Sequence, residues 1–276
     1  MSVKIVLDST VDVNPEIKDR FAIVPLNVRF GDEEYLDGVT ITPEKFYEML
    51  VASAELPTTS QPTPMAFEDT YRELVEAGHE VLVITIASKL SGTYQSATIA
   101  ADEFPGKVFV FDSRTAAIAS GVLAEYALQL AEQGMSAEMI LNELIRQRNR
   151  VGLYAIVDTL EYLKKGGRLN AAAAVVGGVL NLKPLISVEN GEIKTLGTAR
   201  GAKKAFAMLT EISGNNGVDL EKPVLLGYTG ASDESLRKYM EGATEIWGEE
   251  PKRAIVGATI GVHAGPGVVA VAYFKK

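Results

Sequence analysis

The sequence predicts an α/β protein of two domains, with a parallel sheet in the N-terminal domain and a mixed sheet in the C-terminal domain. Its 276 residues are 47% hydrophobic, which is enough for two cores. Apolar β-branched runs alternate with segments of helical periodicity up to about residue 150, as in a parallel sheet covered on both faces. Beyond that point, Asn190-Gly191 indicates a hairpin of antiparallel strands. We therefore expect domains at residues 1–150 and 151–276.

The first domain is expected to alternate strands and helices. Strands are predicted where apolar runs end in polar turns, and helices where a capping hydroxyl or a proline precedes an apolar stripe. Gly31-Asp32 suits a tight turn between two of the strands. The predicted strands are 3–7, 21–30, 33–36, 81–86 and 108–111. The predicted helices begin at Pro43 and Pro64 and then cover 91–104, 115–132 and 136–149.

The second domain is expected to mix hairpin strands with helices. Asn170 can cap a short helix of small residues, and Gly265-Pro266-Gly267 suits a tight turn between the last two strands. The predicted strands are 154–157, 185–188, 193–196, 224–228, 256–260 and 268–274. The predicted helices are 171–176, 202–212 and 235–245.

Composition excludes several classes of protein. There is no cysteine, so disulfides and thiolate chemistry are ruled out. The net charge of −9 opposes general attraction to nucleic acid or to an anionic membrane face, although local basic residues could still recruit an acidic partner. The N-terminus lacks a secretory pattern, and apolar stretches such as 171–180 are too short and glycine-rich to span a bilayer. We expect a cytoplasmic protein without stable membrane insertion or nucleic-acid binding.

Polar turns follow three apolar strands of the first domain. They are Asp8-Ser9-Thr10, the segment 88–93 and Asp112-Ser113. The carboxyl ends of parallel strands face one crevice, where ligands usually bind. A fourth polar segment, 58–62, lies between two helices and could fold over that crevice. The sequence thus predicts a site rich in hydroxyls and poor in cations.

Ser91-Gly92-Thr93 is the segment of this site where a loop enters a helix. The first backbone N–H groups of a helix have no partner within it, and the helix dipole favours an anion there. The Ser91 hydroxyl and a nearby N–H could bind one carboxylate, or Ser91 could simply cap its own helix. Other polar residues are equally open to a loop or turn role. These are Asp8, Ser9, Thr59, Ser60 and Asp112.

Enzyme sites find less support. A serine hydrolase would need His263 beside Ser91 with Asp8 or Asp112, but no G-x-S-x-G elbow surrounds Ser91, and His79 falls in an expected surface turn. No metal-ligand pattern, P-loop or strand-following G-x-G-x-x-G is present. We expect no metal, no cofactor and no catalytic residue, and an acyl hydrolase using Ser91 and His263 stays an alternative.

Taken in order, the motifs resemble the DegV family, whose members are similar to the fatty-acid-binding subunit of bacterial fatty acid kinase. Each piece alone is a weak signal, but the ordered set runs from the first strand to the last. The matching pieces are Asp8-Ser9-Thr10, 58–62 (TTSQP), 91–97 (SGTYQSA), Asp112-Ser113, 160–168 (LEYLKKGGR) and 261–267 (GVHAGPG).

The resemblance implies a buried long-chain fatty acid such as palmitate, stearate or oleate. It implies that Thr59 and Ser91 hold the carboxylate, that Gly92 supplies a backbone N–H and that His263 joins the network. Ser9, Ser60 and Asp112 are candidates for support. Arg168 and Lys165 would face a separate ATP-dependent kinase that converts the bound acid to an acyl phosphate. A lipid sensor without kinase coupling is a further alternative. Some residues are candidates for the tunnel lining, although ordinary core packing is the more common role for each. They are 171–180, Ile84, Ile86, Leu26 and Leu153.

Overall fold

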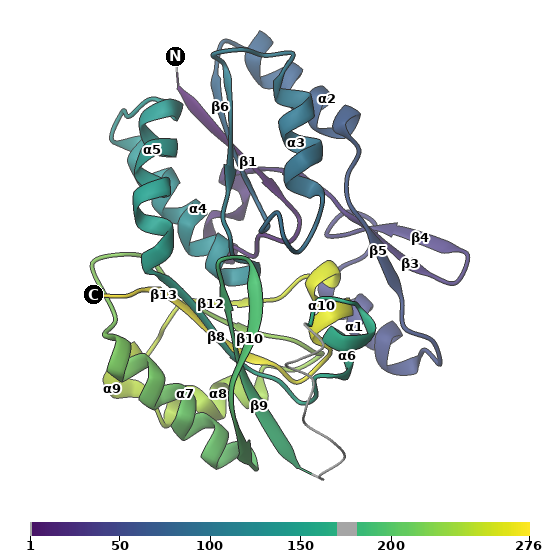
Figure 1. Cartoon of the computed structure of the whole chain (residues 1–276), viewed down its shortest axis with the longest axis vertical. Coiled ribbons are helices and arrows are strands. Elements are labelled where there is room, and N and C mark those ends of the chain that lie inside the picture. The colour runs from purple at the N-terminus through teal and green to yellow at the C-terminus, as the bar shows by residue number, and fades with distance from the viewer. Residues whose placement is uncertain (1, 170–180) are drawn as a thin grey trace.

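Three β-sheets organise the chain in the computed structural model, which describes residues 2–169 and 181–276 (Figure 1). A four-stranded sheet has the order β2-β1-β6-β7, a six-stranded sheet has the order β10-β9-β8-β13-β11-β12, and a three-stranded sheet has the order β4-β3-β5. All pairs of the four-stranded sheet are parallel. The six-stranded sheet is mixed, because only β11 and β12 run parallel. The predicted fold class is therefore confirmed.

The parallel sheet is covered on both faces, as expected. Its strands are β1 (Val3–Asp8), β2 (Ala22–Val24), β6 (Glu80–Thr85) and β7 (Val108–Asp112). Neighbouring residues of a strand point to opposite faces. Val81 and Val83 accordingly pack with α2 (Pro64–Glu76) and α3 (Thr93–Ala101), while Leu82 and Ile84 pack with α4 (Ala117–Glu132) and α5 (Ala137–Gln147).

The six-stranded sheet shares the core beneath α4. Its strands are β8 (Val151–Ile156), β9 (Leu182–Glu189), β10 (Glu192–Arg200), β11 (Val224–Tyr228), β12 (Arg253–Ile255) and β13 (Val269–Phe274). Leu153 and Ala155 belong to the same apolar cluster as α4, whereas Tyr154 and Ile156 pack on the other face. That face is covered by α7 (Ala202–Asn216), α8 (Glu234–Glu241) and α9 (Thr244–Trp247). One continuous core thus joins the two large sheets.

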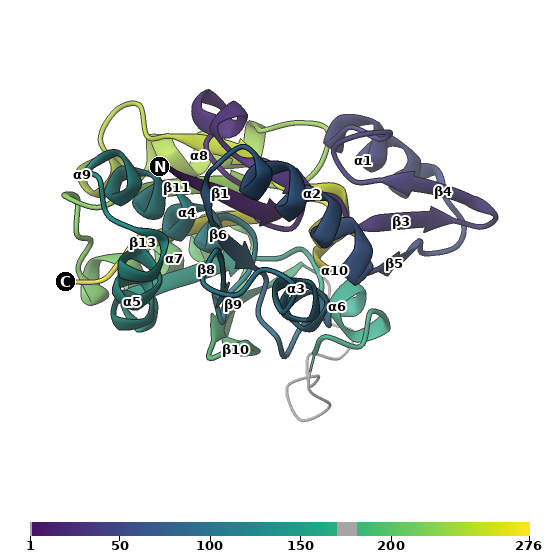
Figure 2. The same ribbon diagram turned by 90° about the horizontal axis from the view of Figure 1, so that it is seen from above.

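The three-stranded sheet projects from one side of the molecule together with α1 (Pro43–Ala52), as Figure 2 shows. It contains β3 (Asn27–Phe30), β4 (Glu33–Leu36) and β5 (Thr58–Ser60), all antiparallel. Its core also takes Ala258 and Val262 from α10 (Ala258–Ala264), a helix near the C-terminus. The division at residue 150 coincides with the end of η2 (Arg148–Arg150), which follows η1 (Pro15–Arg20) as the second short 3-10 helix. Helix α1 belongs to the first 150 residues, but it packs on α10 from the last part of the chain. The division into two domains therefore stays a prediction.

Several predicted elements differ from the structure. Residues 256–260 were expected as a strand, but β12 ends at Ile255 and α10 begins at Ala258. Their apolar run carries no local helix cap, so the sequence pattern resembles a strand. Segment 21–30 is two strands in different sheets, separated at Pro25, because proline lacks the N–H a ladder needs. Segment 235–245 is interrupted at Gly242, and the expected helix 171–176 lies outside the described residues.

Other predicted features are confirmed. Asn190-Gly191 joins β9 to β10 as an antiparallel hairpin, and strand 224–228 has the expected bounds. Gly265-Pro266-Gly267 forms a turn, but it connects α10 to β13 rather than two strands. The 58–62 segment begins as β5, since Thr59 and Ser60 pair with Val28 and Asn27 of β3.

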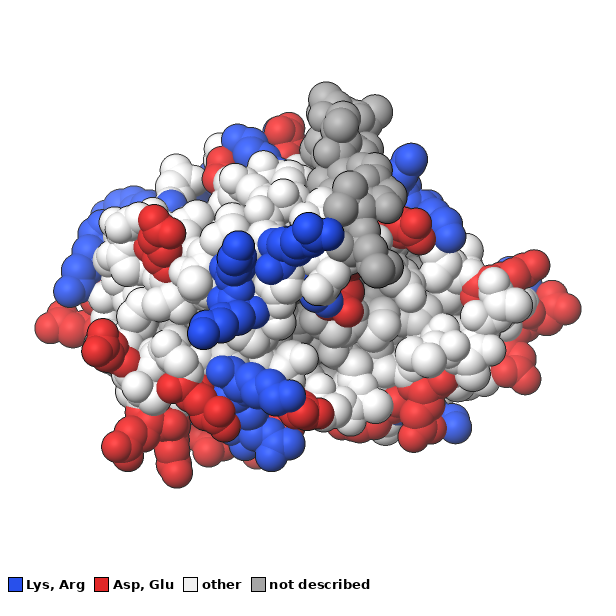
Figure 3. Space-filling view, turned by 90° about the horizontal axis from the view of Figure 1, so that it is seen from below, with Lys and Arg blue, Asp and Glu red and all other residues white. Residues whose placement is uncertain are grey.

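The surface carries both signs of charge in unequal distribution. Several lysine and arginine side chains lie close together near the centre of the face seen in Figure 3, while most acidic side chains lie around its rim. The short α6 (Glu161–Lys165) precedes Arg168, and Lys164, Lys165 and Arg168 are all exposed. No ion pair involves these three residues within the described part of the chain. A basic surface is therefore present on a chain of net charge −9.

Candidate functional site

A cavity of about 330 Å³ lies between the parallel sheet, the mixed sheet and α10. This volume is at the lower end of the usual range for small-molecule sites, roughly 300–1,000 Å³. The lining is mostly apolar, with a few polar groups that come from separate elements. The lining residues are Thr10, Leu26, Thr59, Ser60, Gln61, Ile86, Leu90, Ser91, Gly92, Ala116, Ala117, Leu153, Ala155, Val157, Leu163, Arg168, Ile186, Val188, Ile193, Thr229, Val256, Thr259, Ile260, His263, Ala264, Val268 and Ala270.

The apolar part of the cavity is formed where the two large sheets face each other. Ile86 follows β6, Leu153 lies on β8, and Val188 and Ile193 flank the β9–β10 turn. These residues also belong to, or pack against, the shared apolar cluster. Three of the lining candidates, Leu26, Ile86 and Leu153, thus lie at the cavity. Ile84 is instead fully buried in the core beneath α4, and 171–180 is outside the described residues.

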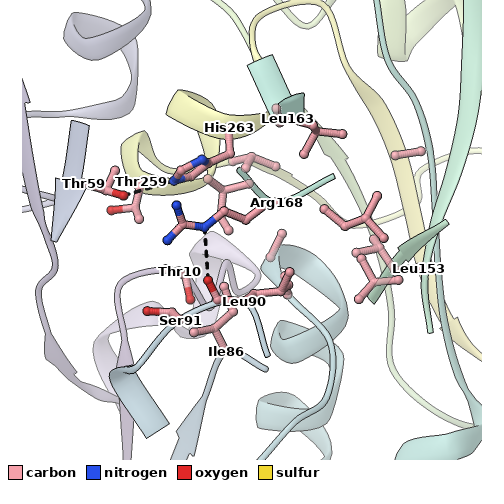
Figure 4. A pocket seen from close by; sticks show the side chains of 18 of the residues that line it. Thr10, Thr59, Ile86, Leu90, Ser91, Leu153, Leu163, Arg168, Thr259 and His263 are labelled. Atoms are coloured by element: carbon pink, nitrogen blue, oxygen red, sulfur yellow. Dashed lines mark hydrogen bonds between the residues drawn. The ribbon is translucent and has the colours of Figure 1, made fainter. Parts of the chain in front are cut away.

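Thr59 and His263 meet at the polar end of the cavity (Figure 4). The Thr59 Oγ1 lies 3.0 Å from His263 Nε2. The other ring nitrogen, Nδ1, is buried without a hydrogen-bond partner among the described residues. Burial, and then the nearby Arg168 charge, lowers the pKa of His263 to about 4. The imidazole is therefore neutral at pH 7, and its tautomer decides which nitrogen donates.

Ser91 and Gly92 lie at the start of α3. The Ser91 Oγ is 2.8 Å from Thr93 Oγ1 and accepts a weak bond of 3.3 Å from Thr93 N–H. Gly92, not Ser91, is the N-cap residue of α3, and Ser91 lines the cavity. A Cβ at position 92 would lie 2.0 Å from Gln61 Oε1, so only glycine fits beside Gln61 as placed. Gln61 in turn donates to Ser96 Oγ at 3.0 Å, which ties the 58–62 segment to α3.

Arg168 lines the cavity from its exposed side without forming an ion pair there. Its guanidinium donates to the backbone oxygens of Leu90, at 3.2 Å, and Gly166, at 2.6 Å. Gly166 touches the histidine, because a Cβ at this position would lie 2.2 Å from His263 Nδ1. Lys165 is exposed and does not line the cavity. The Gly-Gly-Arg segment thus approaches both the histidine and the loop before α3.

The three supporting candidates have different positions. Ser60 lines the cavity and accepts a hydrogen bond from Asn27 Nδ2 at 3.3 Å. Ser9 does not line it; its hydroxyl donates to Asp37 at 3.2 Å and accepts from Leu26 N–H at 2.9 Å. Asp112 also lies away from the lining, where it accepts from the Ser88 N–H and hydroxyl.

The residues required for a hydrolase triad are not brought together. No hydrogen bond or ion pair joins His263 to a carboxylate within residues 2–169 and 181–276. Asp8 instead accepts from the N–H groups of Thr10 and Ile86, both at 2.8 Å, and Asp112 is engaged with Ser88. His79 pairs with Ser2 outside the cavity. The cavity therefore has hydrogen-bond donors at one end, but no carboxylate orients His263 as a hydrolase triad would require.

Within residues 2–169 and 181–276, no group of three or more His, Asp or Glu side chains is placed to hold a metal ion. None of the described helices combines the length and apolar character needed to cross a membrane.

Several lining residues were not singled out from the sequence. Thr10, Gln61, Thr229 and Thr259 all reach the cavity. Thr10 and Gln61 lie within the Asp8-Ser9-Thr10 and 58–62 motifs, so their position next to predicted site residues could have indicated them. Thr229 and Thr259 flank apolar runs and give no pattern of their own.

The comparisons with known proteins identify the family of this chain. The family model described as "Uncharacterised protein, DegV family" matches residues 2–276. The chain belongs to the DegV family. A DegV domain-containing protein of Deinococcus radiodurans is 36% identical over 99% of this chain and 98% of its own length.

Solved structures share the fold over the full length of this chain. A fatty-acid-binding DegV family protein from Thermus thermophilus is 35% identical, with a TM-score of 0.87 and complete coverage of both chains. A stearic acid-binding protein from Eubacterium ventriosum is 28% identical, with a TM-score of 0.84 over 99% of this chain and 98% of that one.

Proposed function

We propose that this chain binds one long-chain fatty acid, with the alkyl tail in the apolar cavity and the carboxylate at Thr59, Ser91, Gly92 and His263. The observation that carries the proposal is the cavity itself: an apolar space closed at one end by hydroxyl, imidazole and helix N-terminal groups. The solved relatives named for fatty-acid binding share the fold over the full chain.

The apolar lining can supply the affinity. A sixteen-carbon acid has about fourteen methylenes, and their burial is worth roughly 11 kcal/mol before costs. Immobilising the ligand and ordering its chain subtract several kcal/mol. The remainder is sufficient for tight binding without an arginine clamp on the carboxylate.

The polar end can orient the acid with several neutral donors, although the exposed Arg168 also lines the cavity. Ser91 and Thr59 carry hydroxyl donors, and the start of α3 presents backbone N–H groups. His263 is neutral at pH 7, because burial lowers its pKa, and it can donate one ring N–H. A carboxylate held by neutral donors keeps more of its nucleophilic character than one paired with a buried guanidinium. We infer that the head group stays reactive.

Reactivity of the head group favours presentation to a kinase. Arg168 lies between the cavity and the surface, and Lys165 is exposed nearby without an ion pair in the described part of the chain. We infer that a separate ATP-dependent kinase approaches this basic surface and phosphorylates the bound acid to an acyl phosphate. Because such a partner uses ATP, the proposal implies a cytoplasmic protein.

Binding is tested by calorimetric titration of the delipidated protein with oleate. Ser91→Ala removes one carboxylate donor and is expected to weaken binding by about tenfold, the effect of roughly 1.4 kcal/mol. Ser136→Ala, which removes a capping hydroxyl on α5 away from the cavity, is the matched control and should bind as the wild type does. Saturable binding that is equally strong in Ser91→Ala, or no binding at all, contradicts the proposed site.

Kinase coupling is tested separately with oleate-loaded protein, ATP and a purified bacterial fatty acid kinase catalytic subunit. Hydroxylamine traps the acyl phosphate as a hydroxamate. Lys165→Ala is expected to lower kcat/KM for the loaded protein severalfold while oleate affinity is unchanged, and Lys238→Ala on α8 serves as the control. Normal oleate binding without hydroxamate would support a lipid sensor instead.

A further inference from the structure

The first turn of α10 is capped by carboxylates from the opposite end of the chain. Gly257 is the N-cap residue and offers no side chain. Its N–H donates to Asp12 Oδ1 at 2.8 Å. The next two N–H groups, of Ala258 and Thr259, donate to Asp37 Oδ1 at 3.1 Å and Oδ2 at 3.0 Å. Three backbone N–H groups that have no partner within the helix therefore donate to carboxylates more than two hundred residues away in the sequence.

These carboxylates are buried, which is an expensive way to cap a helix. Asp37 is 2% exposed and Asp12 is 9% exposed, and Asp12 Oδ2 has no partner among the described residues. Burial raises the pKa of both groups. A serine or threonine at position 257 could accept from one N–H of the first turn without burying a carboxylate. The long-range cap achieves something further, because it fixes α10 relative to the first half of the chain.

The three-stranded sheet contacts α10 at two separate points. Asp37 directly follows β4 and binds the first turn of the helix. Thr59 on β5 binds His263 in the last turn. β4 and β5 both pair with β3, so the two contacts share one rigid support. Both the start of α10 and His263 in its last turn are therefore held by the three-stranded sheet.

Asp37 is itself held from the parallel sheet. The Ser9 hydroxyl donates to Asp37 Oδ2 at 3.2 Å and accepts from Leu26 N–H at 2.9 Å. Leu26 lines the cavity. Ser9 therefore acts on the site through Asp37 and Leu26 rather than by facing the cavity.

We propose that Asp37 is a positioning residue: its carboxylate fixes α10 so that His263 meets Thr59 at the polar end of the cavity. The functional consequence for fatty-acid binding rests on the function proposed above. Asp37 touches neither the cavity nor the ligand, and it acts only through the helix.

The imidazole of His263 provides the test. In the full-length protein, the imidazole NMR signal of His263 is followed against pH. Asp37→Asn replaces one accepting oxygen by an amide donor, so one α10 N–H loses its partner. The His263 midpoint is expected to move upward from about 4 toward the ordinary value of 6.5. Oleate affinity is expected to fall about tenfold.

Two controls separate positioning from loss of stability. Asp12→Asn makes the same chemical change in the neighbouring buried carboxylate but keeps the oxygen that Gly257 uses, so His263 and oleate binding should be unchanged. Leu209→Ala destabilises the core behind the mixed sheet, far from α10, and should leave the His263 midpoint alone. If Asp37→Asn does not fold, Ser9→Ala removes one support of Asp37 and should give a smaller shift in the same direction.

The outcomes are distinct. A wild-type His263 midpoint in folded Asp37→Asn and Ser9→Ala overturns the proposal, as does an equal shift in Asp12→Asn or Leu209→Ala. Absence of oleate binding in the wild type defeats the proposed function, whereas the His263 titration still decides whether Asp37 positions the helix.

Discussion

Thr59 Oγ1 and His263 Nε2 lie 3.0 Å apart although 204 residues separate them in the chain. The threonine comes from a three-residue strand and the histidine from the last turn of α10. Their contact joins the first and last parts of the sequence at the polar end of an otherwise apolar cavity. It is the relationship on which the proposed carboxylate site depends.

Replacing Thr59 by valine tests this contact. Thr59→Val keeps the shape but removes the hydroxyl, and we expect oleate affinity to fall about tenfold. Thr59→Ser should retain most of the affinity. The control is Thr98→Val on α3, whose hydroxyl bonds to the Tyr94 carbonyl oxygen. Equal affinity in Thr59→Val and Thr98→Val would exclude a role for the Thr59 hydroxyl.

The stability of the unliganded protein should depend on His263 below neutral pH. Its folded pKa of about 4 lies under the unfolded value of 6.5, so the unfolded state binds the proton first. The neutral histidine's contribution is fully present above pH 6.5 and is lost as pH falls from 6.5 to 4. Relative to His263→Gln, the wild type should therefore lose unfolding free energy over this window. Parallel denaturation curves for the two proteins at pH 7, 5.5 and 4.5 would contradict this reading.

Asp8 is expected to act in the opposite direction. Burial raises its folded pKa to about 6, above the ordinary value of 3.8. The folded state then binds the proton first, so this contribution is fully present below pH 3.8 and is lost as pH rises through 6. Asp8→Asn should remove that pH dependence. Urea denaturation of both proteins between pH 4 and 7 measures it, and a wild-type pH slope in Asp8→Asn would show that Asp8 does not titrate in this range.

Gly166 should be sensitive to substitution for a local reason. A Cβ at this position would lie 2.2 Å from His263 Nδ1, so Gly166→Ala must displace the ring from Thr59. We expect weaker oleate binding and a shifted His263 NMR signal in a folded protein. Gly214→Ala on α7, where the nearest side-chain atom is 3.9 Å away, should change neither property. Unaltered oleate binding in Gly166→Ala would show that the ring position does not matter.

The length of the bound acid should respond to Leu153. This residue lines the apolar part of the cavity from β8. Leu153→Phe fills part of the space and should shift the bound acids toward shorter chains, while the volume-conserving Leu153→Met should leave their distribution unchanged. Mass spectrometry of extracted acids from both variants makes the comparison. A common distribution would place the tail elsewhere.

The strands of the two large sheets were predictable because a buried strand requires consecutive apolar residues in the sequence. Residues 81–86 are apolar except for Thr85, residues 224–228 form an apolar run, and Asn190-Gly191 has the conformational freedom of a hairpin turn. α10 was mistaken for a strand because Asp12 and Asp37 cap it from afar. No local pattern records that contact.

Only the family resemblance combined the candidate site residues into one proposed carboxylate site. Spacing left the roles of Thr59 and Ser91 open, and nothing in the sequence brings position 263 beside position 59. The hydrogen bond between them arises from the packing of α10 on α1 and the pairing of β5 with β3. Asp37 was missed for the same reason, since an aspartate after a strand is typical of an ordinary turn.

The most direct measurement of fatty-acid binding is native mass spectrometry of the purified chain, followed by denaturation and identification of any released molecule. The account predicts one acid of about fourteen to eighteen carbons per chain, released on unfolding and depleted in the double variant Thr59→Val, Ser91→Ala. A chain that carries no acid and takes up none when oleate is added would contradict it.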